Sequence, residues 1–138
     1  MKRKFSKNWK NSKQPRKQRK FLAKAPIHIK RKMISSKLSK ELKQKYKRRS
    51  VALRKGDKVL VMKGKFKKKE GKISEIKSKS MKVYIEGLQI KKQDGSKISI
   101  PFRASNLKII DLNLDDKKRI KKLEKNKEKT KENKSWLI

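Results

Sequence analysis

A cluster of lysines around one aromatic residue is the most distinctive chemistry in the sequence. Between Gly64 and Gly71 stand Phe66 and the lysines Lys65, Lys67, Lys68 and Lys69. Ammonium groups attract phosphate oxygens, and an aromatic ring can stack on a base. A tight, positively charged loop of this kind is suited to lying on the phosphate backbone of a nucleic acid.

Catalytic and metal-binding chemistry finds little support. The chain has no cysteine, one histidine (His28) and 12 scattered acidic residues. A lone histidine forms neither a metal site nor a proton relay without partners, so we interpret His28 as a packing or phosphate-contacting residue. No nucleophile–base pair and no P-loop motif is present. We therefore expect no enzyme activity, no cofactor, no metal ion and no small-molecule substrate.

The balance of charge predicts a polyanionic partner. The 138 residues carry a formal net charge of +36 and are only 32% hydrophobic, which allows one small core in one domain. In a compact free protein this charge repels itself, and a bound polyanion relieves the repulsion. Nucleic acid is the leading candidate and an acidic membrane surface the second. Narrow helical apolar faces disfavour the membrane surface, and no apolar run approaches the roughly 20 residues of a membrane span.

Basic residues are concentrated near the N-terminus. Residues 1–50 hold 21 Lys and Arg against a single acid, which indicates a binding arm. Residues 1–25 show no sustained helical or strand period, so we predict a basic extended arm there. It is either a solvated, disordered tail or an arm that becomes ordered between RNA helices. Phe5, Trp9 and Phe21 favour the second interpretation, because aromatic rings can stack on bases.

Two short helices are predicted within residues 26–50, packing on the sheet that follows. Pro26 suits the first turn of one helix. Ile29 and Met33 are four residues apart and would share its inner face, while the basic residues at 30–32 would point outward.

The second of these helices is predicted within residues 38–49. Ser39 is a suitable N-cap. Leu38, Leu42 and Tyr46 recur every four residues and form an apolar stripe, which we interpret as packing against the sheet rather than as a ligand site.

Residues 51–110 have the pattern of a small β-domain. Strands are predicted at 58–63, 72–77, 81–86, 88–92, 97–100 and 107–110. Among the later strands, Leu88, Ile90 and Ile98 are expected to face inward, and Asp94-Gly95 is a strong hairpin turn. Short strands with turns at close intervals predict a closed SH3-like barrel, which would hide its sheet edges.

Residues 111–138 have the pattern of a charged helical tail. Ile120 and Leu123 give it a thin apolar face, too narrow to predict packing. The apolar ending at 135–138 is either a small anchor onto a neighbouring surface or a mobile tip.

Residues 54–76 resemble the KOW motif, whose pattern is roughly G-D-x-V-x-V, then a glycine, a basic residue and G-K-V/I. The matching residues are Gly56, Asp57, Val59, Val61, Gly64, Lys67, Gly71, Lys72 and Ile73. The resemblance implies structural roles for Gly56, Asp57, Gly64 and Gly71. Lys68 departs from the pattern, since many KOW loops have a glycine there, and a lysine backbone is less free to adopt positive φ.

Further motifs keep their order along the chain. They are SKQPRKQRK at 12–20, APIHIKRK at 25–32, LSKEL at 38–42, RRSV at 48–51, the hairpin at 94–95 and SNL at 105–107. With the KOW motif they are similar to the archaeal and eukaryotic branch of the KOW-containing large-subunit ribosomal protein family number twenty-four. The likeness runs from about residue 12 to 116. The short chain and the absence of an inserted residue in the KOW loop favour the archaeal type.

This resemblance implies a mainly β fold: an SH3-like barrel with short N-terminal helices, a basic extension and a charged C-terminal helix. It implies a cytoplasmic constituent of the large ribosomal subunit that binds the 5′ region of large-subunit rRNA early in assembly, near the polypeptide exit tunnel. The implied partners are rRNA, neighbouring large-subunit proteins and factors that dock at the exit tunnel. The alternative is a KOW-containing transcription or chromatin factor, although such factors usually carry a further folded domain.

The expected contact residues follow from charge and from these motifs. The rRNA-binding candidates are Lys10, Lys13, Arg16, Lys17, Arg19, Lys20, His28, Lys30, Arg31, Lys32, Arg48, Arg49, Lys65, Lys67, Lys68 and Arg103. The base-stacking candidates are Trp9, Phe21 and Phe66. Arginine can form forked hydrogen bonds with phosphate oxygens, whereas lysine acts as a point charge.

Overall fold

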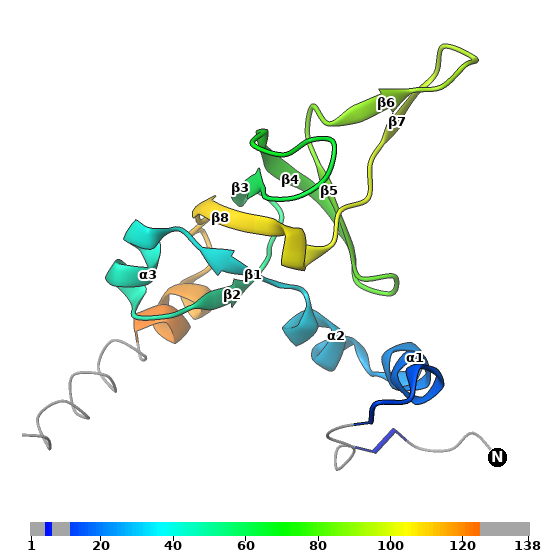
Figure 1. The fold of residues 1–138 in the computed structure, drawn as a ribbon. Coiled ribbons are helices and arrows are strands. Elements are labelled where there is room, and N and C mark those ends of the chain that lie inside the picture. Colours follow the sequence, from blue (N-terminus) through cyan, green and yellow to red (C-terminus); the bar gives the residue numbers. More distant parts are fainter. Residues whose placement is uncertain (1–4, 7–11, 125–138) are drawn as a thin grey trace, which may run out of the picture.

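The computed structural model describes residues 5–6 and 12–124, with a sheet at the centre and helices on either side of it (Figure 1). The strands are β1 (Ser35–Leu38), β2 (Ser50–Ala52), β3 (Lys58–Val61), β4 (Glu70–Lys77), β5 (Lys82–Ile85), β6 (Gln89–Lys91), β7 (Lys97–Ser99) and β8 (Leu107–Asp111). The helices are α1 (Pro15–Lys24), α2 (Ile27–Met33), α3 (Lys40–Tyr46), the 3₁₀ helix η1 (Ala104–Asn106) and a helix at 117–124. The fold is therefore mixed α/β, and the expectation of a mainly β protein underestimated the helices.

Six of these strands form one sheet in the order β2-β1-β8-β3-β4-β5. Neighbours are antiparallel except β1 and β8, which run parallel with Leu38 opposite Ile109. In the described part of the chain the outer strands β2 and β5 do not pair with each other, so the sheet is open and the expected closure into a barrel was wrong. Closure fails because β6 and β7, which the sequence placed in the barrel, pair only with each other.

One core lies against this sheet. Alternation along the strands turns Val59, Val61, Ile73, Val83 and Ile109 inward, each no more than 1% exposed. A period of two puts successive side chains on opposite faces of a strand, so Lys58 and Lys72, which come directly before Val59 and Ile73, face solvent. The apolar residues of the alternating strands predicted this core correctly.

Strand β1 was missed. Its sequence, SSKL, contains two serines and a lysine, which carry little strand preference. It becomes a strand because β2 and β8 lie on either side of it and supply its backbone partners. Ser36 is 2% exposed, and its hydroxyl donates a hydrogen bond to the carbonyl of Ala104 at 2.5 Å. A buried hydroxyl with a partner satisfies a position that looked polar in the sequence.

The β6–β7 hairpin projects away from the sheet (Figure 1). The Asp94-Gly95 turn is confirmed: Gly95 has φ +83°, and Lys92 N–H donates to the Ser96 carbonyl at 2.8 Å. The expectation that Ile90 and Ile98 face inward was wrong, since they are 45% and 42% exposed. The two residues are paired across the hairpin, and neither belongs to the hydrophobic core.

The segment expected to be an extended arm contains a helix. Pro15 begins α1, where its missing N–H costs nothing and its fixed φ suits the first turn. No residue of α1 is buried. The sequence did not predict this helix, because polar residues precede Pro15 and because α1 buries no apolar stripe that would give a helical period.

Helices α2 and α3 lie within the predicted ranges, but Leu38, which was expected in the apolar stripe of the second helix, belongs to β1 because its backbone pairs with β8. Ser39 caps α3 by accepting a hydrogen bond from the Leu42 N–H at 3.3 Å, and Leu38, Leu42 and Tyr46 pack in or against the core. In α2 the expected inner face is weaker, because Met33 is 36% exposed. No helix in the described ranges is both long enough and apolar enough to cross a membrane.

Gly71 is required by a close approach rather than by its backbone angle. A Cβ at this position would lie 2.5 Å from Ile85 Cγ2 and 3.0 Å from the Glu86 carbonyl oxygen. Ile85 is 2% exposed and cannot easily move. A glycine therefore lets β4 and β5 come together, which gives a physical reason for this position of the KOW pattern.

Candidate nucleic-acid interface

The loop between β3 and β4 is closed by its own backbone. Lys68 N–H donates to the Val61 carbonyl, and Val61 N–H donates to the Lys69 carbonyl, both at 2.9 Å. Gly64 has φ +92°, and Lys68 also adopts a left-handed φ of +70° although it is not glycine. Lys65, Lys67, Lys68 and Lys69 are all exposed. The loop therefore presents several ammonium groups on a constrained backbone.

Phe66 anchors this loop to the sheet. It is half-buried, and its ring meets the buried Phe102 edge-on with centroids 6.2 Å apart. Lys69 Nζ lies 5.2 Å from the Phe66 ring centroid, within cation–π range. Packing thus explains Phe66 without a base, and its stacking on RNA stays a prediction.

Helix α1 carries the basic residues predicted for the arm. Lys13, Arg16, Lys17, Arg19 and Lys20 are all exposed on or beside it. Phe21 packs against Phe5, with ring centroids 4.9 Å apart. Trp9 and Lys10 lie outside the described residues. Figure 1 shows α1 well separated from the β3–β4 loop, so the two basic surfaces are distinct.

One predicted contact residue points inward. His28, Arg31 and Lys32 on α2 are exposed, but Lys30 is only 7% exposed. Lys30 Nζ donates to the carbonyls of Ala23 and Lys79, both at 3.4 Å. The expectation that all three basic residues at 30–32 point outward was therefore wrong for Lys30. Its buried ammonium is satisfied by carbonyls, and it ties α2 to the end of α1 and to the turn between β4 and β5.

A buried ion pair was not anticipated. Asp57 is fully buried and receives both terminal nitrogens of Arg119, at 2.6 and 2.8 Å. It also accepts hydrogen bonds from the backbone N–H of Arg54 at 2.8 Å and of Asn113 at 2.9 Å. Arg119 further donates to the carbonyls of Asn113 and Ala52. The aspartate of the KOW pattern thus holds the helix at 117–124 against the sheet.

The signal for this pair was weak. Arg119 stands among basic residues of the tail, and nothing local distinguishes it from its neighbours. The apolar face of Ile120 and Leu123 was the only hint, and Leu123 is indeed 1% exposed. The helix at 117–124 therefore packs against the rest of the protein through Leu123, which the narrow apolar face was not enough to predict.

A second ion pair lies beside the first. Arg54 Nη1 pairs with a carboxylate oxygen of Asp116. The backbone N–H of Lys118 and then the Arg54 guanidinium hold the pKa of Asp116 below its ordinary value, because both donors favour the ionised carboxylate. The contribution of this pair to stability is present above the ordinary pKa and is lost as the pH falls through the lowered one.

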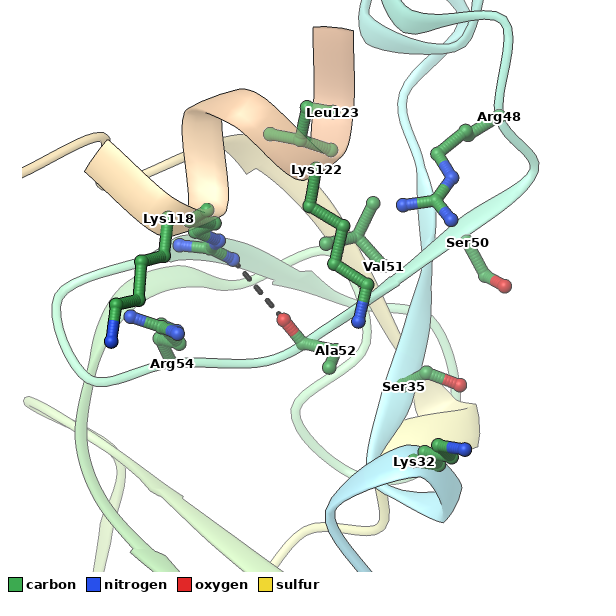
Figure 2. Close-up of a pocket in the computed structure, with 11 residues that line it drawn as sticks. Lys32, Ser35, Arg48, Ser50, Val51, Ala52, Arg54, Lys118, Lys122 and Leu123 are labelled. Atoms are coloured by element: carbon green, nitrogen blue, oxygen red, sulfur yellow. Dashed lines mark hydrogen bonds between the residues drawn. The ribbon is translucent and has the colours of Figure 1, made fainter. Parts of the chain in front are cut away.

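A cavity of about 450 Å³ opens next to these ion pairs (Figure 2). Its lining brings together Lys32 and Arg48, two predicted contact residues from distant parts of the chain. Of the other candidates, Arg49 and Arg103 are exposed, and Arg103 borders a different cavity, beside Met33 and Met81.

The described residues bring basic groups to several surfaces and show no centre for chemistry. Within them, no group of three His, Cys, Asp or Glu side chains could hold a metal ion. A small sheet with a lysine loop, basic helices and a net charge of +36 is typical of the nucleic-acid-binding class of proteins.

A family model that describes the ribosomal proteins L26 of eukaryotes and L24 of archaea matches residues 12–126, and the chain belongs to this family. It is therefore a structural protein of the large ribosomal subunit, in the cytoplasm within the ribosome, and not an enzyme. The family resemblance stated from the sequence motifs is confirmed.

Proposed function

We propose that this protein binds large-subunit rRNA directly, using the β3–β4 loop together with the exposed basic faces of α1 and α2. The observation that carries the proposal is the loop itself. Its lysines are exposed on a backbone closed by hydrogen bonds to β3. A preorganised cluster of cations loses little conformational entropy when it meets phosphates, and an A-form groove is recognised through its shape and backbone.

The finer assignments belong to the same proposal. The sheet is of the SH3-like type, the rRNA contact is in the 5′ region, and binding occurs early in assembly at a position near the polypeptide exit tunnel. Neighbouring large-subunit proteins and factors at the exit tunnel are the protein partners. The organisation is a basic arm at 1–25, two helices within 26–50, the KOW domain at 51–110 and a tail at 111–138. Family membership supports these assignments.

The dependence of binding on salt tests the direct contact. Counterions are released when lysine and arginine neutralise phosphates, so affinity for a transcript of the 5′ half of large-subunit rRNA falls steeply with KCl. If about six phosphates are contacted, affinity falls by about 10³-fold between about 50 and 200 mM salt. Filter binding measures the dissociation constant at each concentration.

Two results would count against the proposal. A flat salt response contradicts phosphate contacts, and equal affinity for transcripts of the 5′ and 3′ halves contradicts the assigned region. Sedimentation of cell extracts separates this protein from a transcription or chromatin factor, because the ribosomal protein stays in the large-subunit peak after a moderate salt wash.

A further inference from the structure

The cavity that Arg103 borders is lined by residues from α1, α2, the turn between β4 and β5, and η1. Its volume is about 360 Å³, within the roughly 300–1,000 Å³ of clefts that take small molecules. The described residues that line it are Leu22, Met33, Ile34, Ser80, Met81, Lys82, Arg103, Ala104 and Ser105. Parts of the chain that are distant in the sequence therefore form one concave surface.

Three of the lining side chains give this cavity an apolar wall. Leu22 is half-buried and Met33 is 36% exposed, and neither belongs to the hydrophobic core. Met81 is half-buried and packs partly against the core. The thioether of methionine is polarisable and makes favourable contacts with aromatic rings. The wall therefore suits a flat aromatic group better than it suits a phosphate alone.

Polar side chains accompany the apolar wall. Ser80, Arg103 and Ser105 are exposed, and Lys82 is half-buried. A hydroxyl can donate and accept hydrogen bonds at the edge of a base, and a guanidinium can form a forked contact with a phosphate. An apolar wall beside such groups matches the two parts of a nucleotide, its base and its phosphate.

The β4–β5 turn that carries one side of the cavity is held in place by the protein itself. Lys30 Nζ donates a hydrogen bond to the carbonyl of Lys79 at 3.4 Å, which ties this turn to α2. Met81 follows in the turn with φ +55°, a left-handed value that is uncommon for residues other than glycine. The position of Met81 is therefore set by its surroundings before a ligand arrives.

The backbone on either side of Arg103 is fixed as well. Phe102 exchanges two backbone hydrogen bonds with Val83, at 2.8 and 2.9 Å. The carbonyl of Ala104 accepts a hydrogen bond from the buried hydroxyl of Ser36. Phe102 and Ala104 are both buried, whereas Arg103 between them is exposed. The guanidinium is thus carried at the border of the cavity by a backbone that is bonded before and after it.

We infer that this cavity receives an unstacked base of the rRNA, with Met33 and Met81 against the base and Arg103 on the phosphate of the same nucleotide. The inference rests on the proposed function and adds to it a site for a single nucleotide. RNA-binding proteins take bases from loops and bulges, where the bases are free to leave the stack. An anionic polymer is the favoured occupant, because α1 and α2, which border the cavity, both carry exposed basic residues.

Uncharged substitutions in the full chain test the contact with the base. Met33→Ala removes part of the apolar wall. Met62→Ala is the matched control, because Met62 is a methionine of similar exposure, 41%, that does not line the cavity. Filter binding with the 5′-half rRNA transcript over a KCl series measures affinity and salt slope. We expect Met33→Ala to bind about fivefold more weakly at every salt concentration, with the wild-type slope, because the lost contact carries no charge.

Two further variants separate the apolar contact from the contact with the phosphate. Met33→Leu returns an apolar side chain of similar volume and is expected to recover most of the affinity that Met33→Ala loses. Arg103→Ala is expected to lower the affinity and to reduce the salt slope by about one unit. Failure of the leucine variant to bind better than the alanine variant would contradict an apolar contact at Met33.

Acylation of 2′-hydroxyls in the bound transcript identifies the nucleotide. The wild type is expected to protect an unpaired nucleotide that Met33→Ala leaves reactive and that Met62→Ala still protects. If Met33→Ala changes the reactivity of base-paired nucleotides only, the cavity touches the backbone of a helix and the assignment of a base is overturned.

The failures of the two proposals are distinguishable. If the wild type binds rRNA with a steep salt slope, and Met33→Ala and Met62→Ala have equal affinity, the base site is wrong and the proposed function stands. If the wild type shows no salt-dependent rRNA binding, the proposed function and the site fail together. Circular dichroism confirms that the variants fold, which is expected because Met33, Met62 and Arg103 are all exposed.

Discussion

At the scale of single residues, Asp57 joins two parts of the chain that are 62 positions apart. It looks like a turn residue in the sequence, following Gly56 at the start of the KOW pattern. In the structure its carboxylate is buried and accepts hydrogen bonds from the backbone N–H groups of Arg54 and Asn113 and from the guanidinium of Arg119. A fully buried carboxylate is tolerated because each of its oxygens has hydrogen-bond partners.

Replacing Asp57 by Asn is expected to destabilise the protein strongly. The change leaves the Arg119 charge buried without its partner, and breaking such a pair typically costs about 3–5 kcal/mol. Urea unfolding followed by circular dichroism measures the change in the free energy of unfolding. Asp94→Asn, at an exposed turn position that also suits Asn, is the matched control and is expected to stay within about 0.5 kcal/mol.

The amides of residues 117–124 provide a second readout for Asp57→Asn. We expect them to lose protection from hydrogen exchange before the strands do, because this ion pair holds their helix to the sheet. Wild-type stability in Asp57→Asn, with unchanged protection of this helix, would show that the pair is not what fixes it.

At the scale of elements, each helix relates to the core differently. Leu42 and Tyr46 bring α3 onto the core, and one leucine with one ion pair fixes the helix at 117–124. Helix α1 has no buried residue. Lys30 Nζ donates a hydrogen bond to the carbonyl of Ala23, in the last turn of α1. An element that adds charge without adding core is expected to serve binding rather than stability.

Deleting residues 1–25 is therefore expected to leave the sheet folded and to weaken rRNA binding by at least tenfold. The deletion removes eleven Lys and Arg and no acid, and a protein that neutralises fewer phosphates has both a lower affinity and a smaller salt slope. Thermal melting checks the fold, and filter binding with the 5′-half transcript checks affinity. Deleting 125–138, where basic residues exceed acids by only three, is the comparison and is expected to cost less. Unchanged affinity after removal of 1–25 would refute the binding role of this segment.

At the scale of the whole molecule, net charge opposes compactness. A formal charge of +36 is spread over 138 residues around one small core. Within the described residues, only three ion pairs offset that repulsion, and one of them is buried. The free protein is therefore expected to be less stable than the same fold surrounded by phosphates.

Raising the salt concentration is expected to stabilise the free protein, because ions screen its self-repulsion over distances of about 10 Å at 0.1 M. The melting temperature, measured between about 0.05 and 0.5 M KCl, is expected to rise by several degrees, while rRNA affinity falls over the same range. A melting temperature that rises while rRNA affinity falls indicates that salt screens the repulsion within the free protein, and not that salt weakens folding and binding alike. A melting temperature that falls with KCl would contradict this picture.

The amino-acid sequence by itself determined whatever depends on neighbours along the chain. Alternation placed Val59, Val61 and Ile73 in the core, Ser39 predicted its helix cap, and Asp94-Gly95 predicted its turn. The exposed lysines of the β3–β4 loop and the family likeness were also readable, because both rest on residue types in a fixed order.

Only the tertiary structure decided what depends on partners distant in the chain. Examples are the parallel pairing of β1 with β8, the hydrogen bond from Lys30 to the carbonyl of Lys79, and the Asp57–Arg119 ion pair. The open strand order of the sheet also depends on pairings between distant segments. Hydrogen-bond donors and charges carry no local sign of which acceptor they will meet. Folding settles that choice, because a buried polar group must find a partner wherever the chain brings one within reach.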